Sequence, residues 1–202
     1  MQLHTNRVVS TCFSSAVVVA IAGALLALAL AVAGPQIGGL GAERADAKSC
    51  KGADRGPRKI SRPQARKAIV CVINIKRQAH GVGNLHAVKP LQKAGGRHAK
   101  TMMSSNCFDH QCGGEAPLAT RVHNTSYLPC SCSWGLGENL AWGKKSRGSP
   151  ARIVDAWMNS PPHRATLLNG SFHHIGIGVA WGSPWNSGMR AATYSAEFGY
   201  KR

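Results

Sequence analysis

Three titratable residues in the second half of the chain have the types and the setting of a binding or catalytic site. Glu138 follows a glycine-rich approach and opens an apolar run, His163 stands in the first turn of a proline-started helix, and His110 lies in a short loop between Cys107 and Cys112. Two imidazoles and one carboxylate can hold Zn²⁺ with an open position, where the metal activates water. His110, Glu138 and His163 are therefore candidate metal ligands, with zinc or calcium as the possible cofactor.

Other catalytic patterns are weaker. The sequence contains neither an H-E-x-x-H helix nor a G-x-S-x-G turn. Ser160 precedes His163 by three residues, a spacing that would allow a Ser–His catalytic dyad. A serine in front of two prolines is better explained as a helix N-cap, whose hydroxyl is already used by backbone N–H groups.

Local signals predict the elements that must position these side chains. Apolar spacing and a Ser-Arg-Pro start predict a helix from about 61 to 79, and a second helix runs from about 88 to 105. Gly95 and Gly96 inside the second helix indicate close approach of another backbone. We interpret His98, in the same helix, as a packing residue.

The rest of the chain mixes helical and strand patterns. These elements are a short helix near 119–122, a strand or buried turn at 137–142, an exposed basic turn at 143–148, helices that begin near 150 and 161, and a final antiparallel pair at 175–181 and 191–200. Helices first and strands last indicate an α+β domain.

The first residues have the pattern of an export signal. Arg7 is the only charge ahead of an apolar run at 16–33, and small-x-small sites end at Ala33 and at Ala47, of which we prefer Ala47. The predicted organisation is a signal peptide at 1–47, a basic lead segment at 48–62 and one domain at 63–202. We expect a secreted protein; an uncleaved membrane anchor is the alternative.

The net charge of +17 is unusual for a domain of this size. Such charge attracts anionic polymers and lipid surfaces, with an affinity that falls with salt. The sequence has no nucleic-acid recognition pattern, so an anionic cell-envelope polymer or lipid surface is the expected partner, and nucleic acid is not. The alternative is that the charge only keeps the protein soluble.

Seven cysteines are present, and Cys12 lies in the predicted signal. An even number of six in an exported chain predicts three disulfides. We expect Cys50 to pair with Cys71. The sequence Cys130-Ser131-Cys132 is too tight for an easy internal bridge, so we expect Cys107 and Cys112 each to cross to one of Cys130 and Cys132. A zinc site on these cysteines is the alternative.

Taken together, these motifs resemble those of the CAP superfamily of cysteine-rich secretory, antigen 5 and pathogenesis-related proteins. The residues that carry the resemblance are His110, 137–139, 157–164 and 194–199. It implies a three-layer α-β-α sandwich with a small central sheet.

The resemblance also implies a cleft lined by two histidines and two glutamates, which holds a divalent cation in several members. His110 and Glu138 match that pattern, but Tyr194 stands where the second histidine would be, and the second glutamate after the helix tryptophan is absent. His163, in the bacterial Ser-Pro-x-His-Arg element, is the replacement, and Glu197 takes a position that is usually glutamine. Tyr194 and Glu197 therefore complete the predicted cleft.

Three function classes are consistent with the sequence. The first, which we prefer, is a secreted monomeric binding module that engages envelope material or a small apolar ligand through the cleft or the basic surface. The second is a metal-assisted hydrolase of peptide or envelope substrates, and the third is a structural or signalling effector without a small ligand. Enzymatic activity is the less favoured class.

Overall fold

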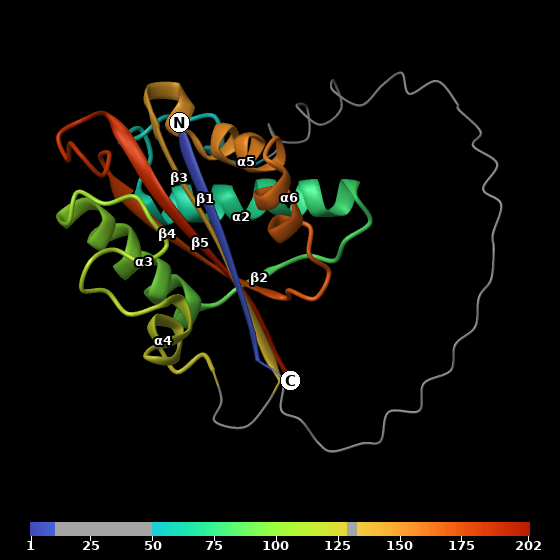
Figure 1. Cartoon of the computed structure of the whole chain (residues 1–202). Coiled ribbons are helices and arrows are strands. Elements are labelled where there is room, and N and C mark those ends of the chain that lie inside the picture. Colours follow the sequence, from blue (N-terminus) through green and yellow to red (C-terminus); the bar gives the residue numbers. More distant parts are fainter. Residues whose placement is uncertain (11–49, 129–132) are drawn as a thin grey trace, which may run out of the picture.

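The computed structural model describes residues 1–10, 50–128 and 133–202. A five-stranded sheet in the order β1-β3-β5-β4-β2 forms the middle layer of this part of the chain (Figure 1). The strands are β1 (Gln2–Ser10), β2 (His86–Ala87), β3 (Trp134–Lys144), β4 (His174–Trp181) and β5 (Ala191–Lys201). All neighbouring strands are antiparallel except β2, which is parallel to β4.

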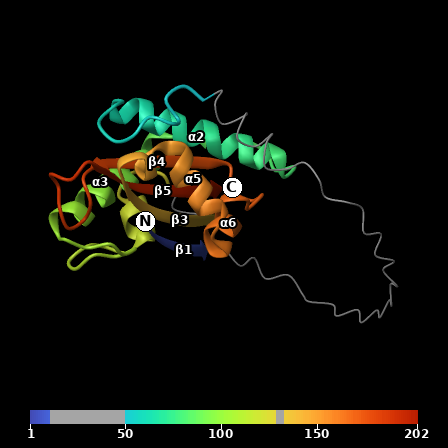
Figure 2. The ribbon, with the colours of Figure 1, turned by 90° about the horizontal axis from the view of Figure 1, so that it is seen from above.

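Helices cover both faces of the sheet. They are α2 (Arg62–Ala79), α3 (Lys89–Ser104), α4 (Leu118–His123), α5 (Pro150–Met158) and α6 (Pro161–Leu167), with a 3₁₀ turn η1 at Lys145–Gly148. Helices α2, α5 and α6 pack on one face, and α3 and α4 pack on the other (Figure 2). The predicted α+β sandwich with a mainly antiparallel sheet is confirmed.

Helix α2 is fixed at both ends by polar contacts. Ser61 forms a capping box with Gln64, as its sequence position predicts. Near the other end, the buried guanidinium of Arg77 donates to the carbonyls of Leu167 at 2.8 Å and Phe172 at 3.1 Å. These bonds tie α2 to the end of α6 and to the segment that follows it. Helix α6 contains the candidate residue His163.

Helix α3 lies unusually close to the sheet. A Cβ at Gly178 of β4 would stand 2.0 Å from the carbonyl oxygen of Gly95, and one at Gly176 would stand 2.0 Å from the Gln92 nitrogen. Only glycine in β4 permits this approach. The expected close backbone contact at Gly95 is therefore present, and it places the next turn of α3, with His98, against β3 and β5.

The lead segment packs on the domain from Cys50 onward. Cys50 is buried and bonded to Cys71 of α2, with a Cα–Cα distance of 5.8 Å, as predicted. Ala53 is also buried, and its carbonyl accepts a hydrogen bond from the Ala151 nitrogen at 2.9 Å. The disulfide thus holds the segment beside the start of α5.

The predicted crossing of Cys107 and Cys112 to later cysteines is wrong. Cys107 and Cys112 are bonded to each other, because the loop after α3 curls back and brings their Cα atoms to 5.8 Å, an ordinary disulfide separation. Cys130 and Cys132 lie outside the described residues.

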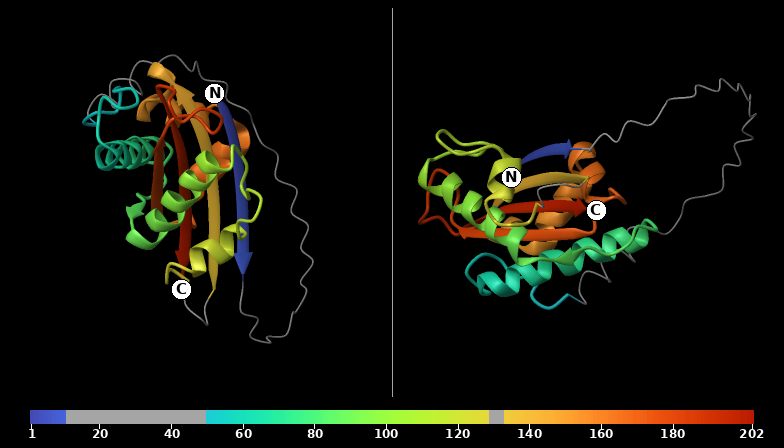
Figure 3. Two further views of the ribbon diagram at one scale, coloured as in Figure 1. Left: turned by 90° about the vertical axis from the view of Figure 1, so that its left-hand side faces the viewer. Right: turned by 90° about the horizontal axis from the view of Figure 1, so that it is seen from below.

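Strand β1 was not expected from the sequence, which places residues 2–10 at the start of the export signal. These nine residues pair with β3 along the edge of the sheet (Figure 3). The apolar run at 16–33 and both cleavage sites lie outside the described residues, so the export signal stays a prediction. No helix within 1–10, 50–128 or 133–202 is long and apolar enough to cross a membrane.

Candidate functional site

The centre of the site is the Glu138 carboxylate on β3, which is fully buried. Its Oε1 accepts from Nδ1 of His110 at 2.6 Å, and its Oε2 accepts from a guanidinium nitrogen of Arg121 on α4. The Ser195 oxygen lies 3.4 Å from the same Oε2. Burial raises the pKa of Glu138, and the charge of Arg121 acts in the opposite direction. The predicted proximity of His110 and Glu138 is therefore present in the fold.

A second buried carboxyl, Glu197 of β5, lies directly opposite Glu138 in the strand register. Its Oε1 accepts from Ser195 at 2.8 Å and is 4.0 Å from the guanidinium of Arg121. Burial first, and the negative charge of Glu138 second, raise the pKa of Glu197 well above its usual value. The neutral acid is therefore the favoured form of Glu197.

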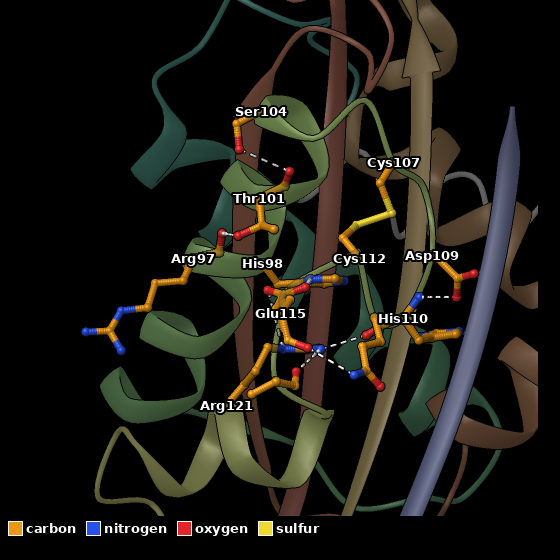
Figure 4. The surroundings of a disulfide bond; sticks show 12 residues. Arg97, His98, Thr101, Ser104, Cys107, Asp109, His110, Cys112, Glu115 and Arg121 are labelled. Atoms are coloured by element: carbon orange, nitrogen blue, oxygen red, sulfur yellow. Dashed lines mark hydrogen bonds and ion pairs between the residues drawn. A yellow bond between two sulfur atoms is a disulfide. The ribbon is translucent and has the colours of Figure 1, made fainter.

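His98 of α3 joins the site from above the sheet. Its Nδ1 lies 2.7 Å from Glu115 Oε2 (Figure 4). Its Nε2 lies 3.9 Å from Glu138 Oε2. Burial, helped by the positive charge of Arg121, lowers the pKa of His98 to about 3. The neutral ring donates from Nδ1 to Glu115, and its Nε2 has no hydrogen-bond partner in the described structure.

Arg121 connects these groups. Besides its ion pair with Glu138, it donates from Nη1 to the His110 carbonyl at 2.6 Å, and its Nε is 3.9 Å from Glu115. Figure 4 shows Arg121 reaching from α4 toward the loop that the Cys107–Cys112 disulfide closes. One guanidinium therefore fixes both the loop bearing His110 and the carboxylate that His110 contacts.

His163 does not enter this network. Adjacent residues of a strand point to opposite faces of the sheet, so Asn139 points away from the face that Glu138 shares with α3 and α4. The Asn139 side chain donates to the His163 carbonyl of α6 at 3.0 Å, which places α6 on that opposite face. Burial lowers the pKa of His163, a backbone hydrogen bond at His4 acts in the opposite direction, and the charges of His110 and His4 lower the pKa further.

The predicted N-cap position of Ser160 is confirmed, but the role predicted for its hydroxyl is wrong. Ser160 is the N-cap residue of α6, but its hydroxyl makes no capping bond to the backbone. Instead Ser160 Oγ lies 2.7 Å from Nδ1 of His163. The two prolines that follow Ser160 remove the first two backbone N–H donors of the helix, which frees the hydroxyl for the imidazole.

Tyr194 is also misplaced in the predicted cleft. It is fully buried in the core beneath α2 and α5, and its hydroxyl donates to the Gly148 carbonyl at 2.9 Å. Tyr194 and Glu197 are three residues apart on one strand, so their side chains point to opposite faces of the sheet. Glu197 belongs to the site and Tyr194 does not.

The proposed metal ligands do not fit a metal ion in this arrangement. Both Glu138 oxygens already accept hydrogen bonds, and the Arg121 guanidinium occupies the position from which a cation would neutralise the carboxylate. His163 lies on the other face of β3. Within the described residues, no group of three or more His, Cys, Asp or Glu side chains has the geometry to hold a metal ion. The hydrolase hypothesis stays an untested prediction.

Sequence reasoning missed Glu115 and Arg121 and assigned His98 to packing alone. One signal was available: the chain has only eight acidic residues, and every glutamate beyond the predicted signal reaches this site. These glutamates are Glu115, Glu138 and Glu197.

The fold and the site define a class of protein: a disulfide-linked α-β-α domain with a buried glutamate–histidine–arginine network at its sheet edge. Residues 70–197 match the Cysteine-rich secretory protein family, and the chain belongs to this CAP family. It is 36% identical over 122 residues to the uncharacterized protein YkwD of Bacillus subtilis (strain 168), an alignment that covers 59% of this chain and 44% of YkwD.

Solved structures share the fold. An extracellular protein containing a SCP domain from Bacillus anthracis str. Ames has a TM-score of 0.54 at 22% identity, over 69% of this chain and 43% of that protein. An outer surface protein from Borrelia burgdorferi has a TM-score of 0.57 at 21% identity, over 72% of this chain and 99% of that protein. The chain thus spans less than half the length of YkwD and of the B. anthracis protein.

Proposed function

We propose that this protein is an extracellular binding module that attaches to anionic cell-envelope material through a basic groove between α2 and α3. One observation carries the proposal. The stretch from Arg55 to Phe108, which includes both helices, contains no aspartate or glutamate but holds twelve of the 25 lysines and arginines of the chain, of which only Lys76 and Arg77 are buried. A charge distribution of one sign along two neighbouring helices favours an anionic partner.

The basic groove is a physical feature as well as a charge pattern. Although α2 and α3 pack on opposite faces of the sheet, both line two adjoining cavities along β4, of about 420 Å³ and 750 Å³. The two cavities share Pro63, Arg66 and Gln92 in their walls. Residues of β4 form an apolar floor. The cations around the basic groove are Arg62, Arg66, Lys67, Lys93, Arg97 and Lys100.

Phosphate-bearing polymers and anionic lipid headgroups share the chemistry that this groove would recognise. At physiological ionic strength the screening length is about 8 Å, so the attraction is strong only for ligands that approach the cations closely. Each lysine or arginine near an anionic surface contributes about 1 kcal/mol. The predicted export signal and the observed disulfides support an extracellular setting for such an encounter.

The test compares two triple variants with the same loss of charge. Arg66→Gln, Lys93→Gln and Arg97→Gln together remove three cations from the basic groove. Arg147→Gln, Arg152→Gln and Arg190→Gln, the matched control, remove three exposed cations elsewhere. The probes are poly(glycerol phosphate) and vesicles of phosphatidylglycerol in phosphatidylcholine.

We expect the groove variant to lose about 3 kcal/mol, or about 100-fold in affinity at low salt, because three contacts of about 1 kcal/mol each disappear. The control variant should lose much less. Binding to the polymer but not to the vesicles, or the reverse, identifies the source of the phosphate. Equal losses of affinity in both variants would mean that binding depends only on the net charge of the protein and not on the position of the cations, and the proposal would fail.

A second candidate ligand is a small amphiphile with an apolar tail. The smaller cavity is lined by Val70, Ile175 and Ile177, and Arg66 and Lys67 stand at its rim. An apolar cavity with cations at its mouth fits a tail with an anionic head. Displacement of a fluorescent fatty acid by a long-chain carboxylate, but not by the matched alcohol, would support this ligand.

A further inference from the structure

The outer edge of β3, the edge that pairs with β1, lies apart from the basic groove and has no role in the function proposed above. On one side β3 pairs with β5 over its whole length. On the other side it pairs only with β1, in a register that runs from Gln2 opposite Trp142 to Ser10 opposite Trp134. The left view of Figure 3 shows β1 lying along β3 as the last strand of the sheet.

Without β1, this edge would lack the protection that edge strands usually have. Natural edge strands are short, or carry proline or central lysines, because exposed backbone N–H and C=O groups invite pairing. β3 has eleven residues and no proline, and its one cation is the terminal Lys144. Its edge therefore offers a long, regular template for another strand.

Side chains near this edge contact β1 at two places. At one end the His4 ring packs edge-on against Phe108 with centroids 4.9 Å apart, and Trp142 Nε1 donates to Gln2 Oε1 at 3.2 Å. Further along, the Arg7 guanidinium carbon lies 5.9 Å from the centre of the Phe172 ring. Specific side chains thus add to the backbone ladder.

An aromatic cluster of Phe108, Trp142 and Trp185 marks the first of these places. The Trp185 ring is 5.7 Å from that of Trp142 and 6.4 Å from that of Phe108. Trp185 is 51% exposed, which makes it the most exposed large apolar side chain in the described parts of the chain. A solvent-exposed tryptophan beside an open strand edge suits a peptide side chain.

The strand that occupies this edge belongs to the predicted export signal, which ends at Ala47 in the preferred prediction. Once that signal is removed, residues 2–10 are gone and β3 becomes an open edge. We propose that the exported protein binds an extended peptide by strand addition along β3, antiparallel to it, and that residues 2–10 occupy this site in the precursor.

The site would place the bound peptide beside the buried network. Asn6 of β1 is opposite Glu138, His4 lies 5.8 Å from the His110 ring, and α6, with His163, packs against β1. A peptide strand would therefore run between His110 on one face of the sheet and His163 on the other. An aromatic or imidazole side chain at the His4 position would reach Phe108.

The experiment uses the protein recovered after export and a fluorescent peptide with the sequence of residues 2–10. Mass spectrometry first establishes the N-terminus, and retention of residues 2–10 in the exported protein would overturn the proposal. Anisotropy then measures binding of the peptide. The precursor, with its own strand in place, should bind it at least tenfold more weakly than the exported protein does.

Backbone methylation tests the geometry. One peptide is N-methylated at Leu3, Thr5 and Arg7, and its partner at His4, Asn6 and Val8. In a strand, alternate N–H groups point to opposite edges, so only one of the two sets can donate to β3. One peptide should bind about as well as the parent and the other at least about tenfold more weakly, because three hydrogen bonds are lost.

Trp185→Ala tests the aromatic cluster and, because the side chain is half exposed, should leave the fold intact. It should weaken binding severalfold, as should a peptide with alanine in place of His4. Equal weakening by both methylated peptides, or absence of binding to the exported protein, would overturn strand addition. Because these measurements do not involve the basic groove, their failure leaves the proposed function standing, and the reverse also holds.

Discussion

Arg121→Met is the substitution whose effect the structure predicts most strongly. Methionine keeps much of the side-chain length but removes the guanidinium that Glu138, Glu115 and the His110 carbonyl share. The Arg121 side chain is 6% exposed and Glu138 is fully buried, so the ion pair is an interior one. Removing one partner of a buried pair costs about 3–5 kcal/mol, because the remaining charge is left uncompensated.

The loss should depend on pH and on Glu138. Without the positive charge of Arg121, burial raises the pKa of Glu138 further, so the carboxyl takes up a proton as the pH falls. The loss of folding stability caused by Arg121→Met should therefore be smaller at pH 5 than at pH 8. Glu138→Gln in the same chain removes the uncompensated charge. The double variant should therefore be more stable than the sum of the two single losses predicts, by about 1–3 kcal/mol.

Urea unfolding of the four proteins of this cycle provides the assay, with slopes compared to exclude a change in the unfolded state. A loss below about 1 kcal/mol for Arg121→Met would show that Glu138 is satisfied by other groups. Strict additivity with Glu138→Gln would show that the two side chains do not interact, and either result would refute the network described above.

Further predictions concern charge, metal and thiols. Burial raises the pKa of Glu197 in the folded protein, so this group contributes stability that is fully present below the ordinary glutamate pKa and is lost as the pH rises from there through the folded pKa. Thermal unfolding from about pH 4 upward should therefore show Glu197→Gln losing less stability with rising pH than the parent, and identical pH profiles would contradict this. The Arg121→Met substitution removes the cation that neutralises Glu138, so the variant protein should bind more Zn²⁺ than the parent in calorimetric titration. Tighter Zn²⁺ binding by the parent would mean that the guanidinium does not compete with a metal cation for the carboxylate. The Cys50–Cys71 and Cys107–Cys112 bonds leave Cys130 and Cys132 as the one remaining pair, so the predicted three disulfides require a bridge between these two. Thiol labelling of the exported protein under denaturing conditions should modify no cysteine other than Cys130 and Cys132, and label on any of the four bonded cysteines would contradict the structure.

Local signals were sufficient where a residue's neighbours in sequence decide its conformation. Ser61 with Pro63 marked the start of α2, and Gly95 marked the close approach of α3 to β4. Pairing over distance left no such signal. Nothing in residues 2–10 distinguishes a strand from the start of an export signal, because β1 exists only through its register with β3. The Cys107–Cys112 bond likewise depends on how one loop curls.

The candidate site was predicted in part for similar reasons. His110 and Glu138 were found and lie together. Tyr194 and Glu197 are three residues apart on a predicted strand, so parity alone shows that only one of them can line the same face as Glu138. Arg121 could not be singled out among 25 lysines and arginines, because only the fold brings α4 beneath the loop that contains His110.

The most direct test of the proposed function is the affinity of the exported protein for poly(glycerol phosphate) at low and at physiological salt, measured for the parent, the basic-groove variant and the charge-matched control. The account predicts that the parent's affinity falls steeply with salt, that the groove variant (Arg66→Gln, Lys93→Gln and Arg97→Gln) binds about 100-fold more weakly than the parent at low salt, and that the control stays near the parent. Equal affinities for the two variants, or binding by the parent that is indifferent to salt, would contradict it.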